Sequence, residues 1–465
     1  MIFASSIFLY GFLPLFLVLY YLSPRKLKSL TIAIASYIFY GWWRPDFVLL
    51  MLASTVVDYT CGNRIVRARL EPGTGRKGKR WLLLSCVVNL GLLGYFKYAN
   101  FGIETFNTLV TTFGMQPVGW VEIVLPVGIS FYTFQTMSYT IDVYRDVSPP
   151  VRRFTDFMCY VAMFPQLIAG PIVRYNTVAE QLHSRTHTLT KFGLGVLCFQ
   201  AGMIKKVLLA DIIGPVVDQA YAADTLSTLD AWIGPVAYSL QMYFDFSGYS
   251  DMAIGLGLML GFRFPINFNS PLRATSFTDF WCRWHISLST FLRDYLYIPL
   301  GGNQKGVVRT YINLGLTMLL GGLWHGAKWP FVIWGAFHGF CLIFERFCNK
   351  QSLYAWTPKP VQIFITYLLG MVGWVIVRSD TMSDAGTMFE AMFGGGASTG
   401  LGLEITPLHL LAGVIAAIVA WFLPTTQYFI KRVNMTWAFA IQPAFVLALL
   451  HLHFEDHVPF LYFQF

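Results

Sequence analysis

Apolar stretches long enough to cross a lipid bilayer recur along the whole chain, and they constrain its fold more than any other feature. The stretches are residues 5–23, 29–43, 47–63, 81–97, 120–141, 154–173, 190–212, 230–260, 307–327, 330–347, 360–378, 406–424 and 434–452. Several are short or interrupted by glycine and proline, so we expect about ten to twelve complete crossings. Because a spanning segment must satisfy its own backbone hydrogen bonds, such stretches fold as helices. The expected fold class is therefore an all-α polytopic membrane protein. No internal repeat or separate soluble domain interrupts the series, so residues 1–465 are expected to form a single membrane domain.

The composition excludes several other classes of protein. The chain is 55% hydrophobic and only 12% charged, whereas soluble domains carry about 25% charged residues. A net charge of +9 would suit a nucleic-acid partner in a soluble protein, but the basic residues lie in short loops, as in proteins inserted with positive loops inside. The seven cysteines show no CxxC spacing, which argues against a disulfide scaffold and against a cysteine metal site. We expect no nucleic-acid partner and no bound metal.

The distribution of basic residues orients the amino-terminal part of the chain. Arg25, Lys26 and Lys28 follow the first apolar stretch, and seven further basic residues lie between positions 64 and 80. The turn at 42–46 carries a single arginine. Both basic loops are expected on the cytoplasmic side. The amino terminus is then external, and the first stretch, which lacks a basic leader and a cleavage site, is interpreted as a span rather than a signal peptide.

Residues 269–306 are too polar for a span that faces lipid, yet they are rich in phenylalanine and tryptophan. Phe280, Trp284, Ser287, Phe291, Asp294 and Tyr295 recur at helical spacing. Polar backbone at membrane depth is tolerated only where protein or a water-filled cavity surrounds it. We expect amphipathic or re-entrant helices here, lining a central funnel that opens to the cytoplasm.

Two Trp-His pairs are the strongest candidates for chemistry. Trp284-His285 lies in the polar segment, and Trp324-His325 ends an apolar run in the sequence Gly-Gly-Leu-Trp-His-Gly. Ionisable residues inside spanning segments are usually functional, and histidine exchanges a proton near neutral pH. His325 is predicted to be a general base that acts on a hydroxyl. His285 could equally be a polar residue in a wet vestibule.

Other polar residues are weaker candidates. A structural role is expected for His338, and the His453–His457 pair, with Asp456 beside it, is not expected to hold a metal. Residues 243–251 place Asp245 in an apolar helix without a Gly-x-Ser-x-Gly elbow, so its acids are expected to hold helices together or to orient a histidine. The sequence Gly-Gly-Asn-Gln-Lys-Gly at 301–306 lacks the context of a phosphate-binding loop. A looser role for it in holding a donor at the cytoplasmic mouth stays open.

Several ordered motifs resemble the membrane-bound O-acyltransferase family, and in particular its bacterial branch that O-acetylates exopolysaccharides. The motifs are Gly94-Tyr95-Phe96-Lys97-Tyr98, residues 125–132 and 168–171, residues 243–251, Arg283-Trp284-His285-Ile286-Ser287 and Leu323-Trp324-His325-Gly326. They are densest between residues 94 and 346, and the likeness fades beyond Arg346. The resemblance implies a ring of transmembrane helices around a thin core crossed by a tunnel.

The resemblance also implies a reaction. His325 would be the catalytic histidine and His285 the second histidine of the tunnel. From their places in the sequence, Trp284 and Trp324 are expected to wall the tunnel, and the weaker candidates for its support are Asp245, Arg283, Asn303 and His338. An acyl thioester such as acetyl-coenzyme A would donate from the cytoplasm, with no permanently bound cofactor. Periplasmic SGNH-type acetyltransferases would then place the acetyl group on a polysaccharide such as alginate or cellulose, with the chain in a bacterial inner membrane.

Two alternatives remain open at this point. One is a transporter of polymer or of a lipid-linked precursor, in which the histidines relay protons; it predicts inverted repeats, which the sequence does not show. The other is an acyltransferase of the same family with a different acceptor, such as teichoic acid, a lipid or a protein.

Overall fold

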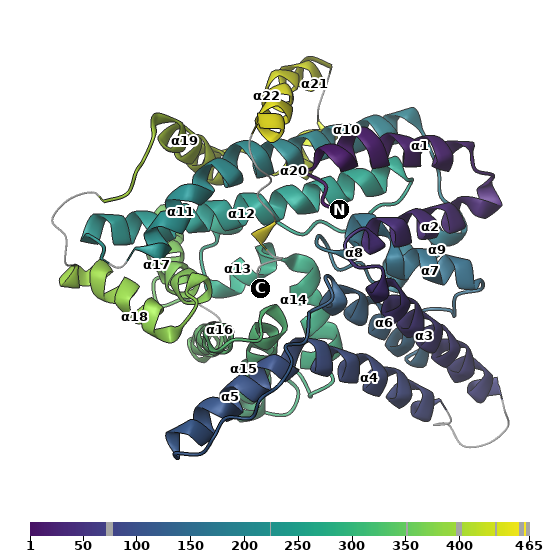
Figure 1. The fold of residues 1–465 in the computed structure, drawn as a ribbon, viewed down its shortest axis with the longest axis horizontal. Coiled ribbons are helices and arrows are strands. Elements are labelled where there is room, and N and C mark those ends of the chain that lie inside the picture. The colour runs from purple at the N-terminus through teal and green to yellow at the C-terminus, as the bar shows by residue number, and fades with distance from the viewer. Residues whose placement is uncertain are drawn as a thin grey trace. The chain divides into compact units, whose positions relative to one another are not determined.

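The structure is a computed structural model, which describes residues 1–70, 78–223, 225–349, 352–396, 402–432, 435–454 and 460–461. Throughout these ranges, all regular secondary structure is helical (Figure 1). The all-α prediction is therefore confirmed.

The chain packs into two compact units, which are described separately. The first unit comprises Met1–Gly193 and Leu256–Phe264, and the second comprises Leu194–Gly255 and Pro265–Phe465. The single domain expected from the sequence stays a prediction.

The first unit is built mainly from nine helices. They are α1 (Leu13–Leu22), α2 (Lys28–Gly41), α3 (Asp46–Leu70), α4 (Lys79–Leu93), α5 (Ala99–Thr112), α6 (Ile129–Tyr144), α7 (Phe154–Ala162), α8 (Phe164–Leu167) and α9 (Tyr175–His183). A phenylalanine cluster around Phe164 packs α1, α2 and α8 together. Asp58 of α3 is fully buried and accepts hydrogen bonds from Ser85 and Asn89 of α4. This bonding satisfies the carboxylate and ties α3 to α4.

Two of the apolar stretches are not continuous helices in the structure. In 120–141, α6 begins only at Ile129, after Pro126 and after Gly128, whose φ of +75° stops a helix from extending backwards. In 154–173, α7 ends at Ala162 and is followed only by the short α8. Proline interrupts helical hydrogen bonding, and Pro171 follows directly after α8 and the Ile168–Gly170 bend. These breaks agree with the expectation that glycine and proline interrupt several of the apolar stretches.

The second unit contains the remaining helices. They are most of α10 (Leu189–Ile204), η4 (Lys205–Asp211), α11 (Ile212–Ala222), most of α12 (Thr228–Met259), α13 (Phe277–Arg283), α14 (Ile286–Leu292), η6 (Arg293–Tyr297), α15 (Val307–His325), α16 (Trp329–Phe347), α17 (Lys359–Arg378), α18 (Met382–Glu390), α19 (Pro407–Phe422), α20 (Thr426–Lys431), α21 (Met435–Ala440) and α22 (Gln442–Phe454).

Helices α15 and α16 pack closely against each other through glycines. A β-carbon added to Gly335 of α16 would lie 2.5 Å from the main-chain oxygen of Met318 and 3.2 Å from the Cα of Gly322, both on α15. Small residues let two membrane helices approach backbone to backbone. This contact holds α15, which ends at His325, close against α16.

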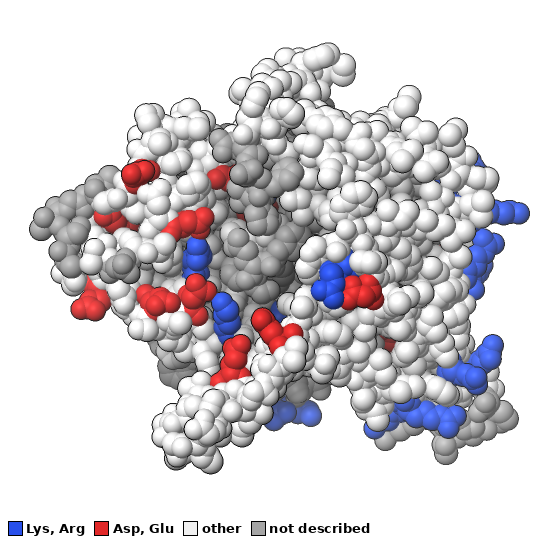
Figure 2. All heavy atoms as spheres, in the orientation of Figure 1, with Lys and Arg blue, Asp and Glu red and all other residues white. Residues whose placement is uncertain are grey.

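Within the described parts of the chain, three helical stretches are long and apolar enough to cross a membrane: 79–112, 359–378 and 435–454. Ile7–Leu22 and Pro407–Phe422 are shorter apolar helices. All five coincide with predicted spans, while the total of about ten to twelve crossings stays a prediction. On the face drawn in Figure 2, uncharged residues cover most of the surface and charged side chains gather in small groups.

Candidate active site

His285 lies at a sharp break between α13 and α14. Its backbone is in the left-handed region, with φ of 43° and ψ of 54°. A neighbouring extended segment holds the break, because Asn269 N–H donates to Arg283 O and Ile286 N–H donates to Asn267 O, both at 2.9 Å. The single helical stripe predicted from Phe280 to Tyr295 is therefore wrong: left-handed backbone cannot continue an α-helix.

The break turns the His285 side chain inward, where it is completely buried. Its Nδ1 lies 3.1 Å from Oδ1 of Asn267. Its Nε2 has no hydrogen-bond partner in the part of the chain that the structure describes. A buried polar atom without a partner is costly and calls for a functional explanation.

His325 faces His285 from the carboxyl end of α15. The two imidazole centroids are 6.3 Å apart. Trp324 packs against both rings, at 6.3 Å from His285 and 5.1 Å from His325. His285 is buried, so the wet vestibule considered for it is not observed, and His325 is half-buried at the end of α15.

A narrow cavity opens beside His325. Its walls are mainly aromatic, from Phe277, Phe280, Trp284, Phe331, Trp334 and Trp374. The polar side chains that reach it include His325, His338 and Tyr367. An apolar pocket with a few convergent polar groups is the usual form of a small-molecule site.

Trp284 and His338 line this cavity, whereas Trp324 packs against the two histidines and is not part of the lining. Trp284 stacks on Phe280 at 5.7 Å, and both line the wall. His338 is buried, and its Nδ1 lies 3.3 Å from Nε1 of Trp281, which can only donate. The ring of His338 packs on Trp334 at 4.7 Å, and Trp334 packs on His325 at 5.1 Å. His338 thus combines the expected structural contact with a place in the wall.

Asp245 does not reach either histidine of the pair. Its carboxylate forms an ion pair with Lys206 of η4 at 2.7 Å and accepts a hydrogen bond from the main chain of Leu461. Asp251, one helical turn and a half along α12, pairs with Lys205 at 2.7 Å. The interpretation that these acids hold helices together fits the structure, and the interpretation that they orient a histidine directly does not.

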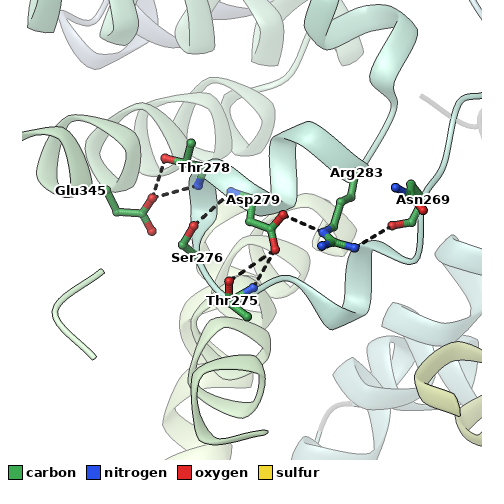
Figure 3. A network of polar contacts seen from close by, with 7 residues as sticks. All are labelled: Asn269, Thr275, Ser276, Thr278, Asp279, Arg283 and Glu345. Atoms are coloured by element: carbon green, nitrogen blue, oxygen red, sulfur yellow. Dashed lines mark hydrogen bonds and ion pairs between the residues drawn. The ribbon is translucent and has the colours of Figure 1, made fainter. Parts of the chain in front are cut away.

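Arg283 also has a structural position. Its guanidinium donates to Asp279 at 2.7 Å and to the main chain of Asn269 at 3.3 Å (Figure 3). At the other end of α13, the carboxylate of Glu345 accepts hydrogen bonds from the main chain of Phe277 and Thr278. These bonds fix both ends of the short α13, whose end positions the Trp284-His285 break.

Asn303 lies away from the histidines. It is exposed in the turn before α15, whereas His325 is the last residue of that helix. A 19-residue helix is about 28 Å long, so the two residues are at opposite ends of it. The glycine-rich turn and the catalytic motif are thus separated by the whole of α15, and a role for Asn303 in holding a donor at the cytoplasmic mouth stays a prediction.

Sequence reasoning missed Asn267, which contacts the buried histidine. The sequence held one signal for it, a polar residue between the apolar Ile266 and Phe268. In the structure the Asn267 side chain is buried. The possible metal pair His453–His457 is not placed, because residues 455–459 lie outside the described residues.

The arrangement of two facing histidines beside an aromatic cavity can be compared with known proteins. The model of the membrane-bound O-acyltransferase family matches residues 121–375. The chain belongs to this family. It is therefore a membrane acyltransferase, and the family assignment argues against the transporter alternative.

Individual relatives of this acyltransferase are extensive matches. It is 51% identical to "Probable alginate O-acetylase AlgI" of Azotobacter vinelandii, over 90% of this chain and 84% of the relative. It is 46% identical to the protein of the same name from Pseudomonas putida, over the full length of both chains. It is 35% identical to "Peptidoglycan O-acetyltransferase" of Helicobacter pylori, over 85% of this chain and 80% of the relative.

Proposed function

We propose that this acyltransferase moves acetyl groups across a bacterial inner membrane for the O-acetylation of an exopolysaccharide. The observation that carries the proposal is the placement of His325, which lies in the wall of the aromatic cavity and faces a second histidine at 6.3 Å. The names of the similar proteins, two of which refer to alginate and one to peptidoglycan, support a polysaccharide as the final acceptor.

The proposed chemistry is acyl transfer assisted by a general base. An acceptor hydroxyl in the cavity attacks the carbonyl carbon of an acetyl thioester, while His325 takes the hydroxyl proton. The carbon–sulfur bond then breaks, and the thiolate leaves and recovers a proton from the histidine. Positioned acid–base catalysis of this kind contributes about 10²–10⁴-fold to a rate. The aromatic walls limit water near the thioester and so reduce its hydrolysis.

The donor is proposed to be acetyl-coenzyme A or another acetyl thioester that approaches from the cytoplasm. A charged donor of this kind cannot cross the bilayer, whereas an acetyl group passed through a tunnel can. Lys305 and Arg309 lie at the start of α15, and Arg346 lies near the end of the antiparallel neighbour α16. By the positive-inside rule this basic end is cytoplasmic, which places His325 toward the periplasmic side.

Periplasmic SGNH-type acetyltransferases are the proposed partners that deliver the acetyl group to the polymer. The amino terminus is then also periplasmic, as the basic loops after the first and third apolar stretches suggest. Alginate is the polymer that the printed names of two relatives favour, and cellulose is a second outcome of the test.

The test compares His325→Ala with His183→Ala in membrane vesicles supplied with labelled acetyl-coenzyme A, polymer and the partner enzyme. His183 is an exposed histidine at the end of α9 and serves as the matched control. We expect His325→Ala to abolish acetyl transfer at unchanged protein abundance, and His183→Ala to retain it. Normal transfer by His325→Ala would refute the assignment, and label transfer to alginate against cellulose identifies the polymer.

A further inference from the structure

We propose that Asn267 is a positioning residue that holds His285 in a single tautomer, with the proton on Nδ1 and the lone pair of Nε2 directed into the site. The inference rests on the proposed function, since it assigns the second histidine its part in the reaction. Three features of the hydrogen bonding support it: the orientation of the Asn267 amide, the tautomer of His285 and the rigidity of the break.

The first step is the orientation of the Asn267 side-chain amide. The main-chain N–H of Ser287 points to Oδ1 of Asn267 at 3.3 Å, and a main-chain N–H can only donate. The hydroxyl of Ser287 also reaches Oδ1, at 2.8 Å. On the other side, the amide nitrogen donates to the hydroxyl of Ser250 in α12 at 3.1 Å. The oxygen of Asn267 therefore faces the histidine.

The second step is the tautomer of His285. Its Nδ1 lies 3.1 Å from the oxygen of Asn267, and an amide oxygen can only accept. The hydroxyl of Ser287 also lies 3.5 Å from Nδ1, but its single proton is donated to the Asn267 oxygen at 2.8 Å. Nδ1 therefore carries the proton. In a neutral imidazole the other nitrogen is then an acceptor, so Nε2 presents a lone pair. The absence of a hydrogen-bond partner for Nε2 among the described residues leaves this lone pair available to the reaction.

The third step is the rigidity of the arrangement. The main-chain oxygen of Asn267 accepts from Ile286 N–H, so the same residue also holds the backbone of the break. Left-handed backbone at a non-glycine residue such as His285 is strained and persists only where its surroundings hold it. Asn267 supplies these bonds through both its main chain and its side chain.

Among the described residues, the rings around His285 are mainly aromatic, and His325 is the titratable side chain that faces it. From α12 it meets the ring of Phe246 at 4.8 Å, and from the 260–270 segment the ring of Phe268 at 6.5 Å. The acids of α12, Asp245 and Asp251, are engaged by lysines of η4. From α15 it faces His325, the titratable group in contact with it.

This geometry gives Asn267 a consequence for catalysis. When His325 takes the proton of the acceptor hydroxyl, it becomes positively charged opposite His285. A lone pair at Nε2 stabilises that charge, whereas an N–H at the same position would oppose it. Preorganised groups directed at developing charge are a main source of catalysis. His285 thus acts through His325, and Asn267 acts through His285.

The experiment compares Asn267→Leu, Asn267→Asp and His285→Ala in the vesicle assay, with Asn313→Leu as a matched control. Asn313 is also fully buried, but it bonds to Gly302 at the far end of α15. We expect Asn267→Leu to lower kcat by about 10²-fold, within the range of acid–base catalysis, with little change in KM. Asn267→Asp should retain transfer, and its acidic limb should move to higher pH because a carboxylate favours the protonated imidazole.

A double-variant cycle separates positioning from a general structural role. If Asn267 acts through His285, Asn267→Leu should cost little more in the His285→Ala background, since interacting residues are not additive. Solid-state ¹⁵N NMR of labelled histidine should assign the proton of His285 to Nδ1 in the unaltered protein and not in Asn267→Leu. Additive losses, an unshifted pH profile in Asn267→Asp, or a proton on Nε2 would each overturn the inference. Failure of the proposed function differs from these results, because the unaltered protein would then transfer no acetyl group.

Discussion

Replacing Gly335 by alanine tests whether the close packing of α15 on α16 positions the catalytic histidine. The new β-carbon would lie 2.5 Å from the main-chain oxygen of Met318, whereas ordinary contact begins at 3.4 Å. Neither the new β-carbon nor the carbonyl oxygen can rotate away, because each is bonded to a helix backbone. The two helices must therefore separate by about 0.9 Å to bring these atoms from 2.5 Å to 3.4 Å. Trp334, the neighbour of Gly335, packs on His325 at 5.1 Å, so this movement reaches the cavity wall. A misplacement of about 1 Å can cost a reaction on the order of 10²-fold.

The expected result is a loss of kcat of about 10²-fold together with about 1–3 kcal/mol of stability, the usual cost of overpacking. Alanine is about 1 kcal/mol better than glycine as a helix former, so a loss cannot arise from weaker helix propensity. Gly315→Ala is the matched control, since its β-carbon would lie 3.5 Å from Ile343 in the same helix pair. Initial rates in vesicles and thermal unfolding in detergent measure both quantities. If Gly335→Ala and Gly315→Ala transfer acetyl equally well, the packing does not position the site.

Three further predictions concern the supports of the site. Lys206→Met removes the cation that pairs with Asp245 at 2.7 Å, and it should lower the free energy of unfolding in detergent by about 3–5 kcal/mol. The double variant with Asp245→Leu should recover part of this loss, and an undiminished loss would contradict the pairing. Glu345→Ala removes the acceptor for the main-chain N–H of Phe277 at 2.6 Å, and it should lower the free energy of unfolding by about 1–3 kcal/mol. Glu345→Gln keeps one acceptor oxygen and should lower it less, and equal losses of stability in the two variants would count against this role. Trp374→Ala enlarges the cavity beside His325. It should raise the preference for butyryl over acetyl thioester by about 10-fold or more, because one methylene in an apolar pocket changes kcat/KM by about 10–200-fold. An unchanged preference in a competition assay would show that this wall does not contact the acyl group.

Much of the fold follows from local sequence patterns. Apolar stretches predicted the helices, because hydrocarbon surroundings leave the backbone no other partner than itself. In 120–141 and 154–173 the helices are shorter than the apolar stretches, because α6 begins only after Gly128 and α7 ends at Ala162. Hydropathy reports which side chains tolerate lipid, and it does not report where the backbone turns.

For the catalytic motif too, the local sequence determined some features and tertiary contacts decided others. The sequence by itself determined that His325 ends an apolar helix beside glycines and that a second histidine follows a tryptophan at 284, because these features lie within a few residues of each other. Only the tertiary structure decided that the two imidazoles face each other, that Asn303 lies at the far end of α15, and that Asn267 binds His285. Those contacts join segments 18 to 40 residues apart in the chain. They depend on the left-handed backbone at His285 and on the approach of α15 to α16, and a pattern of residue types along one segment contains neither.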